Sequence, residues 1–590
     1  MLEAAQSMSD PKEWTTSVLI VGAGPVGLTL AMDLAARGVQ VAIAEIRHYA
    51  EPPSVKSNHV AARTMEVFRR LGVAQKVRNA GLPADFPNDV VFRTRVTGIE
   101  LSRIPIPCRR DRYTATEGPD ARWPTSEPPH RINQIYLEPI LLEHAAAQPN
   151  ITLLHRTQVT SYAQHQDGVV ATAASLDDGS VRLIHCRYLV GCDGGSSAVR
   201  RQMGAKLLGD PVIQRVQSTY IRAPELRHLI QGKPAWCCYA SNPRRNGTVF
   251  AVDGRETWLV HNHLNPDEPD FDSVDRERSL RDILGVGPQF RFDVISKEDW
   301  QGRRLVADRF RNGRVFIAGD AAHLWVPYAG YGMNAGIADA VNLSWLLAAR
   351  LHGWGHPAVL DVYAAERQPI TEQVSRFAMD QAQKMIRARR SVPLNIETPG
   401  KDGDAVREEF GRQAYERNVQ QFCCAGLNFG YFYKDSPIIA GDGHEPPAYT
   451  MGTFTPSTVP GCRAPHLWLP DGRSLYDAFG PGYTLLQLRN TAETKPLEVA
   501  ALAAGMPLTV LDLRGADLPA GYEHALVLCR GDQHVAWRGD RLPDDVAALV
   551  AKLRGVPEED RSARLLATPE TPSTVGRDDT REKIRGMTLR

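Results

Sequence analysis

The chain has 590 residues, 43% of them hydrophobic, and its 69 basic and 68 acidic residues leave a net charge of +1. This length predicts two to four domains, and the balanced charge gives no reason to expect nucleic acid or an anionic membrane as a partner. No apolar run reaches the ~18 residues of a membrane-spanning helix, residues 1–14 lack the apolar stretch of a secretory signal, and nine cysteines without a Cys-x-x-Cys pair favour reduced thiols in a cytoplasmic protein without a zinc site.

The first 45 residues predict a strand, a glycine-rich turn, a helix and a second strand. We expect strands at 17–21 and 39–45 and a helix at 28–36. Such a βαβ unit of about 30 residues is typical of a parallel sheet.

Further along, helix–strand alternation is interrupted twice. Residues 85–129 and 212–265 are rich in strand-like segments, whereas 131–207 and 303–390 return to helices and short apolar strands, so parts of one domain are expected to lie between parts of another. Residues 391–415 look like a connection. From about 446 the expected elements are strands at 483–488, 508–513, 524–529 and 533–537, with helices at 496–504 and 543–553.

The glycine-rich turn carries the pattern of a dinucleotide-binding site. Gly22 permits a tight turn, Gly24 lets the backbone approach a pyrophosphate, and Gly27 lets the helix pack close to the strand. Phosphates would then lie at a helix N-terminus, which favours anions. Glu45 ends the next strand, where an acid can accept a hydrogen bond from a ribose hydroxyl. Whether the nucleotide is FAD or NAD is left open by this motif.

Two more loops follow apolar strands. Asp193 stands in the segment Gly191-Cys-Asp-Gly-Gly and is followed by Arg200, which could neutralise a phosphate. Gly319-Asp320 precede Pro327 and a second glycine-rich turn that opens a helix near Asn334. The positive end of that helix would stabilise a reduced, anionic flavin. Each motif alone is also compatible with an ordinary loop whose aspartate caps a turn.

Together, the three motifs resemble the para-hydroxybenzoate hydroxylase family of FAD-dependent aromatic monooxygenases. The resemblance extends to Asn133-Gln134, Asp339 to Trp345 and Tyr363 to Pro369. Residues 460–466, 471–475 and 535–539 are similar to the branch that contains phenol hydroxylase and 2-hydroxybiphenyl 3-monooxygenase, which has a thioredoxin-like C-terminal domain. The likeness runs from about residue 17 to 555.

This resemblance implies an α/β and α+β multidomain fold. A Rossmann-like FAD-binding domain would be interleaved with a β-sheet substrate domain and followed by a thioredoxin-like domain. The expected boundaries are FAD-binding parts at 15–85, 130–207 and 303–390, substrate-domain parts at 86–129 and 208–302, a helical connection at 391–445, the thioredoxin-like domain at 446–560 and a polar tail at 561–590.

The family also implies cofactors and chemistry. One non-covalent FAD is expected, with NADH or NADPH as co-substrate, and a flavin C4a-hydroperoxide that hydroxylates a phenolic ring. The expected FAD-binding residues are Gly22, Gly24, Pro25, Gly27, Glu45, Arg47, Lys56, Gln134, Asp193, Asp320, Gly332, Met333 and Asn334. Pro327 would lie in the loop at the reactive face of the flavin.

Three departures from the family pattern affect these expectations. Lys56 stands where many members have an arginine, which retains the charge but loses the bidentate fork. A proline pair of the family reads Pro327-Tyr328, and the thioredoxin-like part has no Cys-x-x-Cys, which favours a packing or dimer role.

The base and the substrate are less well defined. His59 is the candidate base, although it is offset by one residue from the family position, which on a strand would turn it to the other face. Trp236, Tyr239, Trp258 and His261 are available as pocket residues, but most are expected in the core. Because no carboxylate-binding arginine can be assigned, a neutral phenol or naphthol is preferred over a benzoate.

Other readings stay open. A Baeyer–Villiger monooxygenase would use the same scaffold and the same flavin peroxide, whereas the Trp-x-Trp-x-Ile-Pro signature of halogenases is absent. A non-catalytic flavoprotein that serves as a binding module is the alternative of another class. The ring that reacts, the choice between NADH and NADPH, the pathway and a possible homodimer are left undecided.

Overall fold

The computed structural model describes residues 12–490 and 493–561. Its first sheet has eight strands, and its central part runs in the order β16-β8-β1-β2-β5 with all neighbours parallel. A β6–β7 hairpin and the short β15 add antiparallel pairs at its margins. The strands are β1 (Lys12–Val21), β2 (Val41–Ala44), β5 (Ile151–Leu154), β6 (Thr157–Gln164), β7 (Val169–Ser175), β8 (Val181–Gly191), β15 (Arg311–Asn312) and β16 (Val315–Ile317).

Two helices with long buried stretches pack against each other, and the first of them also packs on this sheet. They are α1 (Pro25–Ala36) and α8 (Gly332–Leu351), and both are buried over most of their circumference. Such a helix belongs in a core. The helix α4 (Gln134–Ala146) packs against α1. The remaining helices of this region are α2 (Ala62–Arg70), α3 (Ala74–Arg78) and α5 (Ala198–Met203).

The second sheet has nine strands from three separate parts of the chain. Its order is β17-β14-β9-β12-β11-β10-β3-β4, with β13 paired to β9, and only β10 and β3 run parallel. The strands are β3 (Val90–Arg93), β4 (Glu100–Ile104), β9 (Leu207–Arg222), β10 (Cys237–Ser241), β11 (Asn246–Ala251), β12 (Thr257–His263), β13 (Asp293–Lys297), β14 (Trp300–Ala307) and β17 (His323–Trp325).

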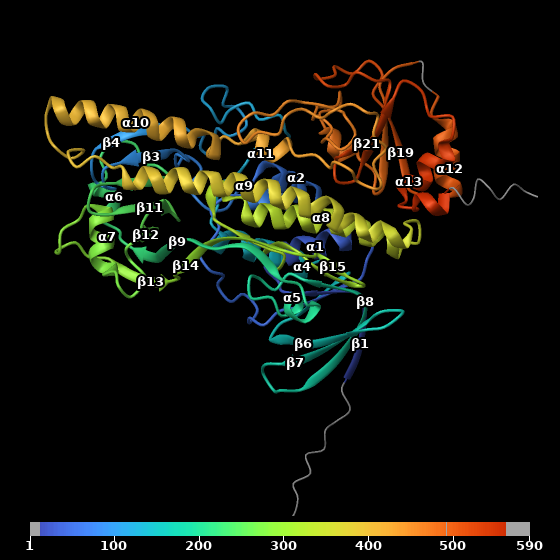
Figure 1. Ribbon diagram of the computed structural model, residues 1–590, viewed down its shortest axis with the longest axis horizontal. Coiled ribbons are helices and arrows are strands. Elements are labelled where there is room, and N and C mark those ends of the chain that lie inside the picture. Colours follow the sequence, from blue (N-terminus) through green and yellow to red (C-terminus); the bar gives the residue numbers. More distant parts are fainter. Residues whose placement is uncertain (1–11, 491–492, 562–590) are drawn as a thin grey trace, which may run out of the picture.

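Two long helices lie along the second sheet, as Figure 1 shows. The helix α9 (Val362–Arg390) contacts β14 and β17, and α10 (Lys401–Phe422) contacts β4. Together they bring the segment around residues 385–418 over strands β3, β10 and β11. Short helices α6 (Leu226–Leu229), α7 (Arg276–Leu284) and α11 (Ala425–Phe429) complete this region.

The C-terminal part forms a separate four-stranded sheet in the order β19-β18-β20-β21. β18 and β19 are parallel, whereas β18–β20 and β20–β21 are antiparallel. Its elements are β18 (Tyr483–Gln487), α12 (Lys495–Ala503), β19 (Leu508–Asp512), β20 (Leu526–Arg530), β21 (Val535–Gly539) and α13 (Val546–Leu553). The expected order of strands and helices is found here, and the thioredoxin-like assignment stays a prediction.

The expected mixed α/β multidomain fold is confirmed, with differences in detail. The second sheet extends past residue 302, where we placed its end, because β14 and β17 belong to it. Residues 401–422 form the helix α10 inside the segment 391–445 that we expected to be a helical connection. Apart from Arg561, the expected tail at 561–590 lies outside the described residues. No helix in the described ranges combines the length and the apolar character needed to cross a membrane.

Candidate active site

The glycine turn between β1 and α1 has the geometry of a phosphate-binding cradle. Gly22 has a φ of 104°, which only glycine adopts readily. A Cβ on Gly27 would lie 2.1 Å from the Gly22 carbonyl oxygen, whereas a Cβ on Gly24 would meet no atom within 4 Å. The α1 N-terminus has no side-chain cap and no acidic residue in its first turn. Open space and free N–H groups therefore meet where a pyrophosphate would bind.

Three of the polar residues expected around the nucleotide, Glu45, Arg47 and Gln134, form one connected chain through Glu138. Glu45 Oε2 accepts a hydrogen bond from the Ala23 backbone at 2.7 Å, and its Oε1 lies 3.1 Å from Arg47 Nε. Arg47 also pairs with Glu138 at 2.6 Å, and Gln134 donates to Glu138 at 2.9 Å. Although burial opposes it, the hydrogen bonds and charge of Arg47 lower the pKa of Glu45. The carboxylate thus stays charged beside the glycine turn.

Asp193 lies at the end of β8 and holds its own loop. Its Oδ2 accepts from the backbone N–H groups of Ala198 at 2.7 Å and Val199 at 3.2 Å, at the start of α5. Arg200 donates to the carbonyl oxygens of Ala321 and Gly195. The structure therefore gives these two residues loop-forming contacts, which bring the Asp193 loop against the Gly319–Asp320 turn.

A buried charge network positions the Gly319–Asp320 turn. Asp339 of α8 accepts from the Gly319 backbone at 3.2 Å, from His323 Nε2 at 2.6 Å and from Arg367 Nε at 2.9 Å. Burial raises the pKa of Asp339, but His323 and Arg367 more than compensate, so the pKa is lowered. Asp320 itself is exposed and has no hydrogen-bond partner within the described ranges, so its carboxylate is available to a ligand. Desolvation by the surrounding protein raises the pKa of Asp320, although the charges of His323 and Lys56 oppose this rise.

The loop from Trp325 to Asn334 joins this turn to the start of α8. Pro327 is exposed and precedes a single 3₁₀ turn, Tyr328–Gly330. The α8 N-terminus has neither a side-chain cap nor an acidic residue in its first turn, and Gly332 and Met333 are half-buried there. Its unpaired N–H groups offer donors to a ring carbonyl.

Asn334 fixes the segment that contains His59. Its Oδ1 accepts from the Ala61 backbone at 2.8 Å, and its Nδ2 donates to the carbonyl oxygens of His59 and Gly330 at 3.1 and 2.7 Å. His59 is buried and its ring lies against Gly330. The segment is irregular rather than a strand, so our argument that one step turns the side chain to the other face was wrong.

Lys56 forms a surface ion pair, and its charge also acts on Asp320, where it opposes the rise in pKa. Its ammonium group pairs with Glu298 at 2.6 Å, and both side chains are substantially exposed. Such a surface pair contributes little free energy. The expected FAD contact of Lys56 stays a prediction.

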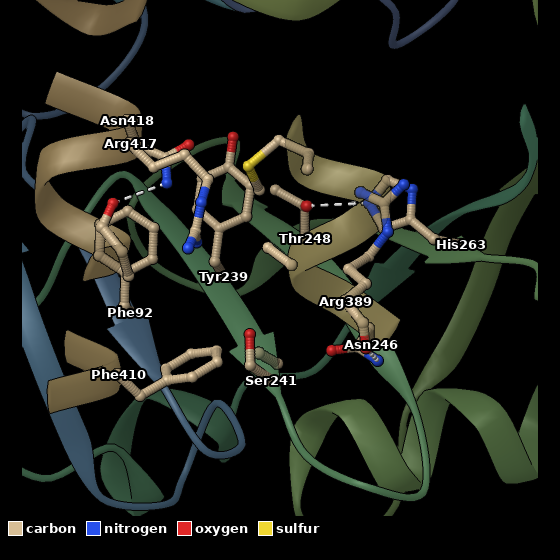
Figure 2. Close-up of a pocket in the computed structure, with 15 residues that line it drawn as sticks. Phe92, Tyr239, Ser241, Asn246, Thr248, His263, Arg389, Phe410, Arg417 and Asn418 are labelled. Atoms are coloured by element: carbon tan, nitrogen blue, oxygen red, sulfur yellow. Dashed lines mark hydrogen bonds between the residues drawn. The ribbon is translucent and has the colours of Figure 1, made fainter. Parts of the chain in front are cut away.

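A cavity opens between the second sheet and the helices α9 and α10 (Figure 2). Tyr239 stacks on Phe92 with ring centroids 5.3 Å apart, and Phe410 of α10 adds a third aromatic wall. Thr248 and His263 are hydrogen-bonded at its edge, 3.1 Å apart. Its wall includes Met385 and Tyr239, which also belong to or pack on the apolar cluster around Val326 and Tyr328. The cavity therefore adjoins the loop that leads to α8.

The four aromatic and histidine residues suggested for the pocket have different roles. Only Tyr239 lines the cavity. Trp236 packs in the core beneath Arg131 and Phe422, and Trp258 donates its indole N–H to the Ala223 carbonyl oxygen. His261 lies between Phe250 and Trp300, and burial lowers its pKa to about 4.

The polar residues at the far side of the cavity were missed by the sequence reasoning. They are Arg389 at the end of α9 and Arg417 and Asn418 on α10. No local motif marks them, because they meet only when two helices fold over a sheet.

Comparison with known proteins identifies the scaffold. A family model described as an FAD binding domain matches residues 15–378, and one described as the C-terminal domain of aromatic-ring hydroxylases matches 457–557. The chain belongs to the FAD-dependent aromatic monooxygenases. It is similar to the FAD-dependent monooxygenase apdD of Emericella nidulans (32% identity, 92% of this chain and 91% of the relative) and to phenol 2-monooxygenase of Pseudomonas sp. (28%, 92% and 93%). It also resembles the rebeccamycin biosynthetic enzyme RebC with reduced flavin (TM-score 0.83, 35% identity, 92% of this chain and 100% of that one).

The residues of this chain fit the flavin nucleotide that the family binds. Three features suit such a nucleotide. They are the open glycine cradle, the charged Glu45 carboxylate that follows the next strand, and Asp320, which has no partner among the described residues. The loop after Asp320 leads to the uncapped N-terminus of α8. The recognition of this family from sequence motifs, and the expectation of FAD, are confirmed.

Proposed function

We propose that this FAD-dependent enzyme uses NADH or NADPH and O2 to hydroxylate a phenolic or naphtholic ring held in the cavity between the second sheet and the helices α9 and α10. The observation that carries the proposal is the junction of two features. The uncapped α8 N-terminus follows the Pro327–Gly330 loop directly, and the same loop contributes to the apolar cluster that adjoins the aromatic cavity.

The bound FAD would supply hydride acceptance and oxygen activation, and the protein supplies binding and orientation. Gly22, Gly24 and Gly27 would admit the pyrophosphate, and Glu45 and Asp320 would bind hydroxyl groups of the nucleotide. The backbone of residues 332–334 would hold the flavin ring. Tyr328 and Val326, both buried, would keep bulk water from the reacting face, which is needed to prevent wasteful loss of the activated oxygen.

His59 is our proposed base for the substrate hydroxyl. Its support is its position: it is buried, it lies against Gly330, and its backbone is tied to Asn334 at the start of α8. Removing a proton from a phenol raises the electron density of its ring, and a positioned base contributes roughly 10²–10⁴-fold. A His59→Gln enzyme should lose the acidic limb of the pH profile for the chemical step while still reducing FAD normally.

The experiment that tests the function is NAD(P)H oxidation by the FAD-loaded enzyme with a panel of phenols, naphthols and hydroxybenzoates, recording product mass and H2O2. A compound that stimulates oxidation and gains one ring oxygen supports hydroxylation. Oxygen found in an ester or lactone would instead assign a Baeyer–Villiger reaction, and no reduction of FAD by either nicotinamide would assign a non-catalytic flavoprotein.

Two further properties belong to this proposal. The nine cysteines are all unpaired and seven of them are buried, which supports a reducing, cytoplasmic location. A homodimer is proposed because dimers are common in the family, and size-exclusion chromatography with light scattering would test it.

A further inference from the structure

The cavity between the second sheet and α9 and α10 has an unusual balance of charge. Of the 15 residues that line it, two are arginines and none is acidic. Figure 2 shows Arg417 and Arg389 in different parts of the wall, with Tyr239 between them. The cavity thus combines aromatic walls with two cations.

Arg389 has only neutral partners. Its Nη1 donates to the Tyr328 hydroxyl at 3.1 Å, and its Nη2 donates to Gln214 Oε1 at 3.0 Å. No carboxylate of the described chain pairs with it. The guanidinium is therefore held in place, half-buried, without a counter-charge.

Arg417 has even fewer contacts. Its half-buried side chain has no hydrogen-bond or ion-pair partner in the described part of the chain, and burial lowers its pKa. The adjacent Glu416 pairs with Arg412 on the outer surface of α10, at 2.8 Å. A partly desolvated cation without a partner costs free energy unless a ligand supplies the missing charge.

The other polar groups of the wall are neutral or donate hydrogen bonds. Burial, followed by the charge of Arg389, lowers the pKa of His263 well below its ordinary value, so the ring is uncharged near neutral pH. His263 Nδ1 is buried and has no hydrogen-bond partner among the described residues, while Nε2 lies 3.1 Å from the Thr248 hydroxyl. When that hydroxyl donates to Nε2, Nδ1 carries the proton and is one more donor.

We propose that this cavity binds the carboxylate of an aromatic substrate, with Arg389 and Arg417 as its recognition groups. A carboxylate accepts two parallel N–H bonds from a guanidinium. The aromatic part would lie along Tyr239, Phe92 and Phe410. Tyr328 connects Arg389 to the loop before α8, because its hydroxyl binds Arg389 and its backbone leads to α8.

The hydroxylation of the bound ring rests on the proposed function. The binding of the carboxylate rests on the cavity alone. This proposal replaces our preference for a neutral phenol, which was based only on the lack of an assignable arginine. It also adds two residues, Arg389 and Arg417, to the positions that determine specificity.

Equilibrium binding to the FAD-loaded enzyme tests the proposal. The probes are 6-hydroxy-2-naphthoate and its amide, 6-hydroxy-2-naphthamide, titrated by calorimetry at neutral pH. The two have nearly the same size and differ in one negative charge. We expect the carboxylate to bind about 10- to 100-fold more tightly, the size of a charge-assisted hydrogen bond.

Substitutions assign that preference to residues. Arg389→Gln and Arg417→Gln should each reduce the ratio of the two dissociation constants, and the double variant should bring it close to one. Arg389→Lys should restore part of it, because the charge returns without the fork. Arg387→Gln, an exposed position on the same helix, is the matched control and should leave the ratio unchanged.

The result can overturn the inference in two ways. Equal binding or no binding of the two probes by the unaltered enzyme would overturn it, and so would a carboxylate preference that survives the double substitution. Arg417→Gln removes no hydrogen bond or ion pair of the described chain, so it still tests the proposal if an Arg389 variant fails to fold. Tight, arginine-dependent binding without ring hydroxylation would refute the proposed function alone, whereas hydroxylation of neutral naphthols with the acid rejected would refute this inference alone.

Discussion

Arg530 of β20 and Glu366 of α9 form a bidentate ion pair in which neither side chain is exposed, with Arg530 Nη2 2.8 Å from Glu366 Oε2. Arg530 also binds Asp532, and Asn342 of α8 donates to the same Glu366 carboxylate at 2.7 Å. The C-terminal domain is therefore attached to α8 and α9, the helices that flank the candidate active site, by charges that are out of contact with water.

Removing one member of this pair should destabilise the protein strongly. Arg530→Met would leave the Glu366 and Asp532 carboxylates buried without their cation, which costs about 3–5 kcal/mol. Urea denaturation followed by fluorescence measures the loss. The double variant Glu366→Gln/Arg530→Met should recover part of it, and Arg514→Met, which breaks an exposed pair with Asp512, should change stability by less than about 1 kcal/mol. A loss in Arg530→Met no larger than in Arg514→Met would contradict the buried-clamp interpretation.

The same cluster predicts how stability falls in acid. Although burial raises it, the neighbouring Arg530 lowers the pKa of Asp532 from 3.8 to about 2. Because the folded-state pKa is the lower one, the stabilisation is complete above pH 3.8 and is lost as the pH falls toward 2. At 1.36 kcal/mol per pH unit, it amounts to about 2–3 kcal/mol.

Asp532→Asn should therefore be less stable than the unaltered protein at neutral pH, and the difference should shrink between pH 3.8 and about 2. Urea midpoints measured across this range test it, with the exposed Asp402→Asn as control. If the difference in stability between the two proteins is independent of pH, the Asp532 side chain contributes through its packing rather than its charge.

The two glycines of the nucleotide turn give a matched pair of substitutions. Gly27→Ala would push a methyl group to 2.1 Å from the Gly22 carbonyl oxygen, so the apoprotein itself should lose about 1–3 kcal/mol. Gly24→Ala meets no protein atom within 4 Å, so the apoprotein should fold almost normally. Its methyl group would instead occupy the space expected for the pyrophosphate.

We expect Gly24→Ala to weaken FAD binding by at least about tenfold, as loss of one charge-assisted hydrogen bond would. Flavin fluorescence on titration into apoprotein measures the affinity, and thermal melting of the apoprotein measures the fold. Unchanged FAD affinity in a well-folded Gly24→Ala variant would mean that the nucleotide does not approach this backbone.

Those parts of the site that depend on local sequence could be predicted. The Gly22–Gly27 turn, Glu45 at the end of β2 and the glycine-rich start of α8 each combine a strand end with a helix start, so spacing alone identifies them. The parts that depend on assembly could not. Arg389 and Arg417 lie on different helices, and their shared cavity exists only after both helices cover the second sheet.

The packing of helix α10 is one such part. Its segment is polar and contains Gly403 and Gly411, which disfavour a helix by propensity. In the structure a Cβ on Gly411 would lie 2.2 Å from the Leu101 carbonyl oxygen, so this glycine permits the helix to approach β4 closely. A tertiary contact therefore outweighs the local preference, and no local pattern reveals it.

Tyr328 gives a test that combines fold and function, because it stands where the family has a second proline. Its ring is buried among Val326, Ala378, Ala382 and Met385, and its hydroxyl binds Arg389 and Gln214. Tyr328→Ala should open a path for water between the cavity and the loop that precedes α8. We expect a larger fraction of the NAD(P)H consumed to appear as H2O2 rather than as hydroxylated product. The ratio of H2O2 to product should rise by roughly a factor of ten, which corresponds to about 1.4 kcal/mol.

Tyr328→Phe separates the two roles of this side chain. It retains the ring that excludes water and removes only the hydroxyl, so the yield of product per NAD(P)H should stay close to that of the unaltered enzyme. Binding of a carboxylate probe should weaken modestly, because Arg389 loses one of its two side-chain acceptors. Parallel assays of oxygen consumption, product and H2O2 in the two variants separate the role of the ring from that of the hydroxyl. Equal uncoupling in the Phe and Ala variants would show that the hydroxyl, rather than the bulk of the ring, protects the reaction from water.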